Sequence, residues 1–493
     1  MLNHFLRLRE LWKSNTIPIY FVSPTPFNLL GMENLIGQFQ FITYIDTFDK
    51  RHPKVYIPPR TLTPVFNHLE EINYYLLSHK RVIEKIKRDR KPLSSQDPAS
   101  KVLFLFFDPT IEEVVKDLQM EILFPSHEDR TKHDNKLDIT QLATKVGVQS
   151  VPHVIAKVRS YRMLTQLAKR HNLGQSLVIQ SAYGDSGKTT FFVENEAQYR
   201  QHAQDIETED QVKVMKKIRC LSTAMEACAT ASGVYIGPLM RELIGIPELT
   251  PFKGGWCGND LTLEAFSPDI RQQARVMAEK LGKALYKSGY RGYFEVDFLL
   301  DQDSNTLYLG EVNPRLSGIS AMTNLSPFAQ ETVPLFFFHL MEWTQTPIQL
   351  SAKTFNDRVV REGAKGQTGQ LILKYTAPDL RILVSAPATG IYTLDPKGNL
   401  ILKKLTSNRL HAKNPDEIFL FRIMNTGEYV YKGADLGIVF INGTLLSPTY
   451  KLTKAAKMWI TAVKHAFVFR ELTEEETALV DRYQTPGSIL KGD

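Results

Sequence analysis

The sequence predicts a multidomain protein of mixed α/β and α+β class, and three observations support this. The chain has 493 residues, too many for one hydrophobic core. Strand and helix patterns alternate over about the first 130 residues, which is typical of a small parallel α/β layer. Short alternating segments broken by Gly and Pro fill residues 369–446. We therefore expect an N-terminal α/β domain over residues 1–130, a central α+β domain over residues 131–345 and a small β-rich domain over residues 346–493.

The N-terminal domain combines strand patterns with helical ones. The expected strands lie at residues 17–22, 55–57 and 102–107, and an expected helix lies at residues 111–120. The basic run at residues 80–91 contains few apolar residues, which favours a solvated helix face over a nucleic-acid site. We therefore expect no nucleic-acid partner.

The central and C-terminal parts carry clear boundary signals. Ser267 is an expected N-cap with Pro268 at the first helical position, and Gly289 ends the apolar stripe, so a helix is predicted over residues 267–288. The other central elements are expected helices at residues 135–146 and 160–169 and expected strands at residues 176–180 and 189–193. C-terminal strands are expected at residues 371–375, 382–384, 392–394, 418–423 and 438–441, followed by a helix at residues 453–467.

Composition narrows the classes of protein that fit the chain. It is 43% hydrophobic and 23% charged, as in ordered globular proteins, and no apolar stretch is long enough to span a bilayer. Cys220, Cys228 and Cys257 lack metal-ligand spacing, and their odd number argues against a disulfide framework. Residues 1–14 lack the pattern of a secretion signal. We expect a cytoplasmic protein with free thiols and no membrane contact, whose net charge of +7 suits an anionic ligand such as ATP.

Two alternating apolar runs flank a polar turn and predict an antiparallel hairpin over residues 294–315. Glu311 and Asn313 are two residues apart on one strand and share a face, and Asp297 on the partner strand can lie near them. Two carboxylates and an amide oxygen are hard oxygen ligands of the kind that Mg²⁺ favours. A solvated polar face is the alternative. The acids interrupt apolar strands and Arg315 follows at once, so we predict a Mg²⁺ site.

A loop of small residues at 181–189 gives a second signal. The backbone N–H groups of Gly184, Asp185, Ser186 and Gly187 can approach a phosphate closely, and Lys188 can neutralise it. Residues 182–189 are one residue away from the GxxxxGK[ST] pattern, so a P-loop NTPase is an alternative. A P-loop continues into a helix, whereas residues 189–193 are β-branched and aromatic, which favours a strand, a loop and a second strand.

At these motifs the chain resembles the ATP-grasp superfamily, which includes biotin carboxylase, D-alanine–D-alanine ligase and peptide ligases. The resemblance covers about residues 110–345, and Glu311-Val312-Asn313-Pro314-Arg315 is its most specific part. It implies a pre-ATP-grasp α/β domain followed by a two-lobed ATP-grasp fold that holds ATP between the lobes. It also implies that Asp297, Glu311 and Asn313 bind Mg²⁺ and that Arg315 is the catalytic arginine.

Other positions match the superfamily less closely. Lys136, after Asn135, resembles the helix-opening lysine that reaches an ATP phosphate. The residues Met215, Lys216, Lys217 and Ile218 resemble the hinge strand that bonds adenine through its backbone. Gln180 stands where many members have Lys, and it can donate a hydrogen bond but cannot neutralise charge. Lys188 is therefore expected to compensate, as a second catalytic residue beside Arg315.

The loop and the order of the parts look most like the pheganomycin-type peptide ligases, which join a carboxylate to an amine. We therefore expect an ATP-dependent carboxylate–amine ligase that acts through an acyl phosphate on small-molecule or peptide substrates and releases ADP and phosphate. The alternatives are biotin carboxylase-like carboxylation, a P-loop-type NTPase and a non-catalytic nucleotide-binding protein. The sequence leaves the oligomeric state open, with a homodimer as one candidate. Trp256, beside Gly254 and Gly255, is either a wall of the substrate pocket or a packed loop residue.

Overall fold

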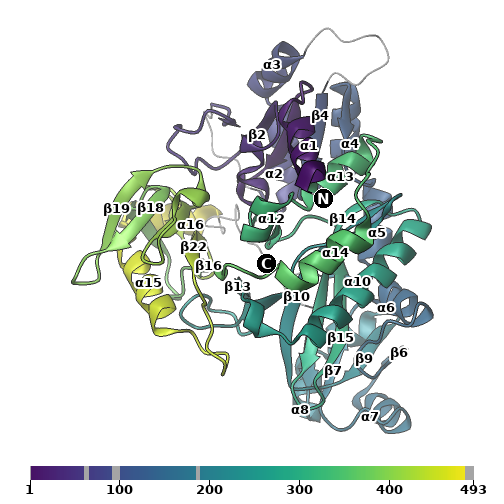
Figure 1. Ribbon diagram of the computed structural model, residues 1–493. Coiled ribbons are helices and arrows are strands. Elements are labelled where there is room, and N and C mark those ends of the chain that lie inside the picture. Colours follow the sequence, from purple (N-terminus) through teal and green to yellow (C-terminus); the bar gives the residue numbers. More distant parts are fainter. Residues whose placement is uncertain (1, 60–65, 91–99, 185–188, 484–493) are drawn as a thin grey trace.

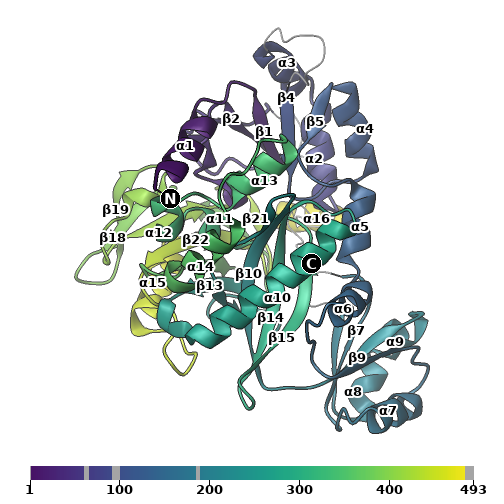
Figure 2. The ribbon, with the colours of Figure 1, turned by 45° about the vertical axis from the view of Figure 1, so that its right-hand side comes forward.

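The structure, a computed structural model, describes residues 2–59, 66–90, 100–184 and 189–483. In the views of Figure 1 and Figure 2, an N-terminal sheet lies at the top and a small sheet lies at the bottom. The strands after residue 368 lie to one side, and a long antiparallel sheet runs between these regions. The predicted mixture of α/β and α+β architecture is confirmed.

The N-terminal sheet is parallel, as predicted, and has five strands in the order β3-β2-β1-β4-β5. Its strands are β1 (Ile19–Ser23), β2 (Phe39–Thr43), β3 (Val55–Tyr56), β4 (Ser100–Phe104) and β5 (Met120–Ile122). The helices of this region are α1 (Leu2–Lys13), α2 (Leu69–Ser78), α3 (Lys80–Asp89), α4 (Pro109–Asp117) and α5 (His127–Asp134).

One strand and one helix of the N-terminal region begin and end earlier than expected, and strands β2 and β5 were not expected. The strand expected at residues 102–107 ends at Phe104, and the helix expected at residues 111–120 is α4. Asp108 caps α4 by accepting a hydrogen bond from the Ile111 N–H, so the helix starts earlier than expected. Gln119 then adopts a φ of 51°, which stops the helix and lets β5 follow.

The small sheet is antiparallel, in the order β6-β9-β7-β8, and confirms the elements expected between residues 135 and 193. Its strands are β6 (His153–Ala156), β7 (Leu177–Gln180), β8 (Thr190–Val193) and β9 (Val212–Lys216). The helices that go with it are α6 (Lys136–Lys145), α7 (Tyr161–Arg170), α8 (Glu196–Gln201) and α9 (Ala203–Thr208). Asn135 fixes the start of α6, because its side chain accepts the N–H groups of Leu137 and Asp138.

The largest sheet runs in the order β15-β14-β10-β12-β13-β16-β22-β20-β18-β19, with β11 paired to β10. Its central strands are β10 (Cys220–Thr230), β11 (Gly233–Ile236), β12 (Met240–Ile244), β13 (Trp256–Leu261), β14 (Gly292–Asp301) and β15 (Thr306–Asn313). Its C-terminal strands are β16 (Thr368–Lys374), β18 (Gly390–Leu394), β19 (Leu400–Leu405), β20 (Ile418–Arg422) and β22 (Asp435–Asn442). Because β13 pairs with β16, the C-terminal strands continue the central sheet. The domain boundaries near residues 130 and 345 stay predictions.

Helices cover this sheet and a further small sheet follows it. The predicted helix at residues 267–288 is α10 (Pro268–Lys287), capped by Ser267 and followed by Gly289 at a φ of 102°. The other helices are α11 (Ser320–Asn324), α12 (Pro327–Glu331), α13 (Phe336–Trp343), α14 (Ala352–Glu362), α15 (Lys454–His465) and α16 (Glu474–Tyr483). A third antiparallel group contains β17 (Arg381–Ser385), β21 (Tyr429–Val430) and β23 (Val468–Arg470).

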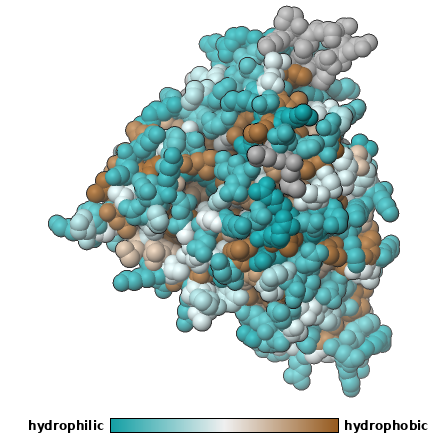
Figure 3. All heavy atoms as spheres, viewed as in Figure 1, coloured by the Kyte–Doolittle hydropathy of each residue, from teal (hydrophilic) through white to brown (hydrophobic). Residues whose placement is uncertain are grey.

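The apolar side chains form one large core and two smaller ones. The large core joins the N-terminal sheet to strands β10, β14 and β15 and also takes in side chains of the C-terminal strands, such as Phe419 and Phe421. A second core lies among the C-terminal strands and α15, and the small sheet has a third. The surface seen in Figure 3 is mostly hydrophilic, with hydrophobic residues in small groups. Within the part of the chain that is described, no helix is both apolar and long enough to span a bilayer. The three cysteines are free thiols, as predicted.

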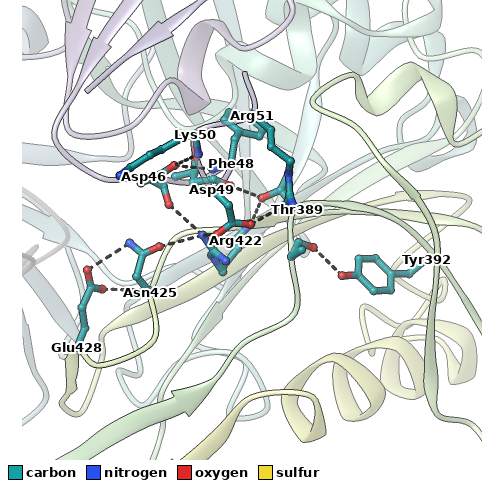
Figure 4. Close-up of polar contacts among 12 residues, drawn as sticks. Asp46, Phe48, Asp49, Lys50, Arg51, Thr389, Tyr392, Arg422, Asn425 and Glu428 are labelled. Carbon is teal, nitrogen blue, oxygen red and sulfur yellow. Dashed lines mark hydrogen bonds and ion pairs between the residues drawn. The ribbon is translucent and has the colours of Figure 1, made fainter. Parts of the chain in front are cut away.

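A polar network ties the loop after β2 to the C-terminal strands (Figure 4). Arg422, at the end of β20, donates from Nη2 to the Asp46 carbonyl at 3.0 Å and to Asp49 Oδ1 at 2.7 Å. Thr389 donates to the Thr47 carbonyl at 2.6 Å. Arg422 is buried, so these contacts replace the water that its guanidinium loses. The N-terminal and C-terminal regions are therefore joined directly as well as through the central sheet.

Candidate active site

A cavity of about 440 Å³ lies between the small sheet and the large sheet. One side is lined by β7, β8 and the end of β9, and the other by β12, β13, β14 and β15. The predicted site residues on its wall are Lys136, Gln180, Met215, Lys216, Lys217, Ile218, Asp297, Glu311, Asn313 and Arg315. The fold therefore brings together residues that are up to 179 positions apart, as shown by the separation of Lys136 and Arg315.

The predicted hairpin is β14 and β15, and its register places the acids face to face. Asp297 pairs with Glu311, and Glu295 pairs with Asn313. Because directly paired residues of an antiparallel sheet share a face, all four side chains are on the cavity side. The register then shifts so that Phe298 pairs with Leu309, which leaves Gly310 as the extra residue of a bulge. The predicted proximity of Asp297, Glu311 and Asn313 is confirmed, and their metal-binding role stays a prediction.

Glu295 joins this group, although the sequence analysis gave it no role. The Asn313 amide donates to Asp297 Oδ2 at 2.9 Å and to Glu295 Oε2 at 3.2 Å. Its own Oδ1 accepts from Arg315 Nη2 at 3.3 Å. The signal was present in the sequence, since Glu295 is two residues before Asp297 on the same strand and also interrupts an apolar run.

The acids of the cavity repel one another and are shielded from water. Burial, followed by the neighbouring carboxylates, raises the pKa of Asp297 well above its usual range. Burial, followed by Glu226 and Glu242, raises the pKa of Glu295 to about 8. Burial and Glu311 raise the pKa of Glu242 to about 7. A cation bound among these groups would relieve this repulsion.

The donor set fits Mg²⁺ by its chemistry. It offers two carboxylates and an amide oxygen, and Asp297 Oδ1 is buried with no hydrogen-bond partner among the described residues. The same part of the chain contains no group of three or more His, Cys, Asp or Glu side chains arranged to hold a metal ion. A Mg²⁺ ion here would therefore need the Asn313 oxygen and oxygens from the substrate or water, as is usual for this metal.

Two lysines stand beside the acids, and only one of them was predicted. Lys136 Nζ lies 3.0 Å from Glu311 Oε2 and donates to the Gly184 carbonyl at 2.7 Å. Lys213, on β9, is 1% exposed and pairs in register with Gln180 on β7. Burial lowers the pKa of Lys213 to about 8, and nearby Lys136 acts in the same direction while Glu311 opposes it.

The position of Lys213 bears on the expected compensation for Gln180. Strand β9 buries Val212 and Val214 in the core of the small sheet, so Lys213 and Met215 face the opposite side, where Met215 lines the cavity. Lys213 thus brings a positive charge next to Gln180, from the neighbouring strand. The sequence signal was a charged residue within an apolar strand, the same signal that marked Asp297. Lys188, the predicted compensating residue, lies outside the described residues.

The loop after β7 is anchored to the start of α6. The Lys136 N–H donates to the Ala182 carbonyl at 2.9 Å, and the Ser181 N–H donates to the Thr189 carbonyl at 3.2 Å. Gly184 has a φ of 137°, and a Cβ added there would lie 2.2 Å from Thr189 Oγ1, so only glycine fits this position. The predicted phosphate-binding residues Asp185, Ser186, Gly187 and Lys188 lie outside the described residues.

The P-loop alternative is wrong. Residues Thr190–Val193 form strand β8, which pairs antiparallel with β7, and the next helix starts at Glu196. A P-loop lysine and threonine would open a helix instead. The predicted strand, loop and second strand are confirmed.

Backbone and side-chain contacts brace the segment that follows Arg315. Asn28 Nδ2 donates to the Ser317 carbonyl at 2.7 Å, and Gln370 Nε2 donates to the Gly318 carbonyl at 2.8 Å. The Arg315 guanidinium lies over the Phe106 ring, 4.9 Å from its centre. Three regions of the chain therefore hold this segment: the loop after β1, strand β16 and the loop after β4.

Comparison with known proteins defines the fold. No protein-family model matches the chain, and no curated protein matches it in sequence. Among solved structures, the biotin carboxylase domain of 2-oxoglutarate carboxylase from Hydrogenobacter thermophilus matches with a TM-score of 0.59 and 10% identity, over 96% of this chain and 94% of that chain. Biotin carboxylase from Campylobacter jejuni matches with a TM-score of 0.57 and 13% identity, over 97% of both chains.

A second kind of enzyme has the same architecture. Carboxyaminoimidazole ribonucleotide synthase from Aspergillus clavatus, solved with ATP, matches with a TM-score of 0.53 and 14% identity, over 92% of this chain and 99% of that chain. All three proteins are ATP-grasp enzymes. At such low identity the likeness defines the fold alone, and this chain has the ATP-grasp fold.

Proposed function

We propose that the chain is an ATP-dependent carboxylate–amine ligase that releases ADP and phosphate. The observation that carries the proposal is the pairing of Asp297 with Glu311 across the hairpin, beside Asn313 and Arg315, in a cavity between two sheets. The ATP-grasp fold supports it, because solved structures with this fold hold ATP or MgADP. The narrower resemblance to pheganomycin-type peptide ligases stays a prediction.

Each part of the cavity has a place in this proposal. The backbone of Met215, Lys216, Lys217 and Ile218 would hold the adenine, and Lys136 with Lys213 would hold the phosphates. Mg²⁺ held by Asp297, Glu311 and Asn313 would neutralise phosphate charge. Arg315 would stabilise the phosphoryl group during its transfer.

The reaction has two steps. A carboxylate oxygen of the acid attacks the γ-phosphorus, the bond from this phosphorus to the β,γ-bridging oxygen breaks, and ADP leaves behind an acyl phosphate. The amine nitrogen then attacks the acyl carbon, loses a proton and displaces phosphate. The protein contributes chiefly position and charge to both steps.

Trapping of the acyl phosphate tests the proposal. ADP release is first screened across amino acids and dipeptides, and hydroxylamine is then added with the acid that stimulates it. We expect the hydroxamate together with ADP and phosphate. Arg315→Met should lower hydroxamate formation by about 100-fold and change ATP affinity by less than about threefold, since its charge acts mainly in the transition state.

The control is Arg291→Met, which removes an exposed arginine outside the cavity. Formation of AMP and pyrophosphate would instead indicate an acyl adenylate and would refute the mechanism. An equal loss of ATP affinity and rate in Arg315→Met would make this arginine a ground-state phosphate binder.

Biotin carboxylase-like carboxylation is the second candidate, because two of the similar solved structures are biotin carboxylases. Stimulation of ADP release by bicarbonate plus biotin, but by no amine, would favour it over the ligase. The Hydrogenobacter domain is described as a dimer, and we propose the same state for this chain. Light scattering that gives the mass of one chain would contradict this assembly.

A further inference from the structure

The cavity extends past the residues to which the proposed function gives a role. Along β12, β13 and the segment after Arg315 it is lined by Glu242, Ile244, Trp256, Ser317 and Ile319. Ile244 pairs with Trp256 across the two strands, and Glu242 is two residues before Ile244. All three therefore belong to one face of the sheet, and they line the same cavity as Asp297 and Glu311, from which strand β10 separates them.

Trp256 is held as a fixed wall of this part of the cavity. A register shift between β12 and β13 pairs Leu243 with Gly258 and Ile244 with Trp256, and such bulges redirect side chains. The indole Nε1 donates to Asn259 Oδ1 at 3.0 Å. A Cβ added to Gly318 would lie 2.4 Å from Trp256 Cη2, so the Gly318 backbone packs directly on the ring.

Asn259 is itself held in place, which makes the orientation of the indole well defined. Gln370 Nε2 donates to Asn259 Oδ1 at 3.2 Å and to the Gly318 carbonyl at 2.8 Å. Both Asn259 and Gln370 are fully buried. Of the two readings of Trp256, a wall of the pocket and a packed loop residue, the structure supports the first.

Glu242 places a further carboxylate on the wall of this part of the cavity. Among the described residues its carboxylate makes no hydrogen bond and no ion pair, whereas Glu311 has Lys136 and Glu295 has Asn313. Its pKa is raised to about 7, first by burial and then by the charge of Glu311. A partly buried carboxylate of this kind is stabilised by a cation, and an aromatic face next to it attracts cations as well.

We propose that Glu242 and Trp256 form the seat for the positively charged amino group of the amine substrate. This rests on the proposed ligase function and names the substrate class of its second half-reaction. Ile244 and Ile319 surround the same space, so the seat suits an amine attached to an apolar body. An anion such as bicarbonate would be repelled by the Glu242 carboxylate.

Equilibrium binding tests the seat without any turnover. Calorimetry on the full chain, with Mg²⁺ and ADP present, compares L-leucinamide with 4-methylpentanamide, which is the same molecule without its α-amino group. We expect the wild-type protein to bind L-leucinamide about tenfold more tightly. Glu242→Gln should reduce this preference to less than about twofold and leave the affinity for ADP unchanged.

Three further variants make the result specific. Glu248→Gln removes a carboxylate that is paired at 3.5 Å with Lys457 at the surface, and it should keep the preference. Trp256→Phe should keep most of it, and Trp256→Leu should weaken binding of both compounds. Equal binding of the two compounds by the wild-type protein would overturn the seat. So would a Glu242→Gln variant that lost ADP and Mg²⁺ affinity but kept the preference, because Glu242 would then serve the metal.

Failure of the proposed ligase function and failure of the amine seat give different results. If no acid stimulates ADP release from the wild-type chain, the ligase proposal fails while the binding preference is still measured. If acids do stimulate it but L-leucinamide shows no preference, the seat alone fails.

Discussion

The ammonium group of Lys136 lies 3.0 Å from Glu311 Oε2 and also donates to the Gly184 carbonyl. One side chain at the start of α6 thus contacts the end of β15 and the loop after β7. Charge-assisted contacts of this kind fix position closely, because both partners are partly withdrawn from water. The predicted phosphate-binding lysine and a predicted metal ligand are therefore direct neighbours.

Glu311→Gln tests the metal role of this pair. The substitution keeps the shape of the side chain and removes its charge, so Mg²⁺-dependent ADP release should fall by at least about 100-fold. The melting temperature should change little, because the side chain is 29% exposed and a pair of this kind stabilises weakly. Glu121→Gln, which removes the partner of Lys101 in the N-terminal sheet, is the matched control. Near-normal turnover in Glu311→Gln would contradict the proposed role of Glu311 as a Mg²⁺ ligand.

Lys213→Met should change stability and nucleotide affinity in opposite directions. Among the described residues the buried Lys213 ammonium group makes no hydrogen bond and no ion pair, and burying such a group costs folding free energy. An apolar side chain of similar length should therefore leave the melting temperature equal or higher. If Lys213 holds phosphate charge, the same variant should bind ATP about tenfold more weakly. Lys157→Met, at an exposed lysine near Asp210, is the control. Unchanged ATP affinity in Lys213→Met would mean that Lys213 does not bind the phosphates of ATP.

Thr189→Val separates the two interpretations of the Gly-rich loop by function. In a P-loop enzyme the threonine hydroxyl would bind Mg²⁺, and its loss would abolish activity. Here Thr189 precedes β8, and its Oγ1 is buried against Gly184. We expect Mg²⁺ dependence and rate of ADP release to stay within about threefold of the wild type, because no step requires that hydroxyl. A loss as large as that of Glu311→Gln would show that the Thr189 hydroxyl takes part in Mg²⁺ binding or catalysis.

The sequence was sufficient for the hairpin site because its geometry is local. Asp297, Glu311 and Asn313 lie on two strands joined by one turn, so strand periodicity alone places them on one face. The start of α10 followed in the same way from its capping residue Ser267. These features need no knowledge of how distant strands pair.

Lys213 and Gln370 were missed for a different reason. Each lies on a strand that pairs with distant parts of the chain, since β9 pairs with β6 and β7, and β16 pairs with β13 and β22. Gln370 contacts Asn259 across 111 positions. Which polar residue of such a strand faces the cavity depends on sheet order, and sheet order is a product of tertiary packing that local patterns do not contain.

His339 should make stability depend on pH. It is fully buried in α13, with Nε2 2.7 Å from the Leu123 carbonyl and Nδ1 accepting the Tyr293 N–H. Burial lowers its pKa to about 3. Below about pH 6.5 this histidine is therefore protonated in the unfolded chain but stays neutral in the folded chain. The stability that this group contributes is present above about pH 6.5 and is lost as the pH falls toward 3.

The size of this effect can be measured by urea unfolding. Between about pH 7.5 and pH 5 the wild-type protein should lose about 2 kcal/mol more unfolding free energy than His339→Gln does. His171→Gln, at an exposed histidine, should keep the wild-type pH dependence. The informative quantity is the change of unfolding free energy with pH, because removing the packed His339 ring also lowers stability at every pH. Equal pH slopes for the wild type and His339→Gln would contradict the assignment.

Gln370 and Asn28 both hold the segment after Arg315, so we expect their effects on ADP release to be interdependent. Gln370 Nε2 donates to the Gly318 carbonyl, and Asn28 Nδ2 donates to the Ser317 carbonyl. Gln370→Leu keeps the volume but removes both of its hydrogen bonds, and should destabilise the chain by about 1–3 kcal/mol. If the segment positions Arg315, kcat for ADP release should fall by about tenfold while KM for ATP stays within about twofold.

A double-mutant cycle with Asn28→Leu decides whether the two braces act through the same segment. When one brace is lost, the segment is already displaced, so loss of the second should lower kcat by clearly less than it does alone. Effects on kcat that simply multiply would mean that the two residues act independently. Asn356→Leu, which removes a buried amide that donates to the Val234 carbonyl, is the control for a structural loss. It should lower the melting temperature without this coupling, because the hydrogen bonds of Asn356 join it to Ile236, Val234 and Glu279 and not to the 315–319 segment.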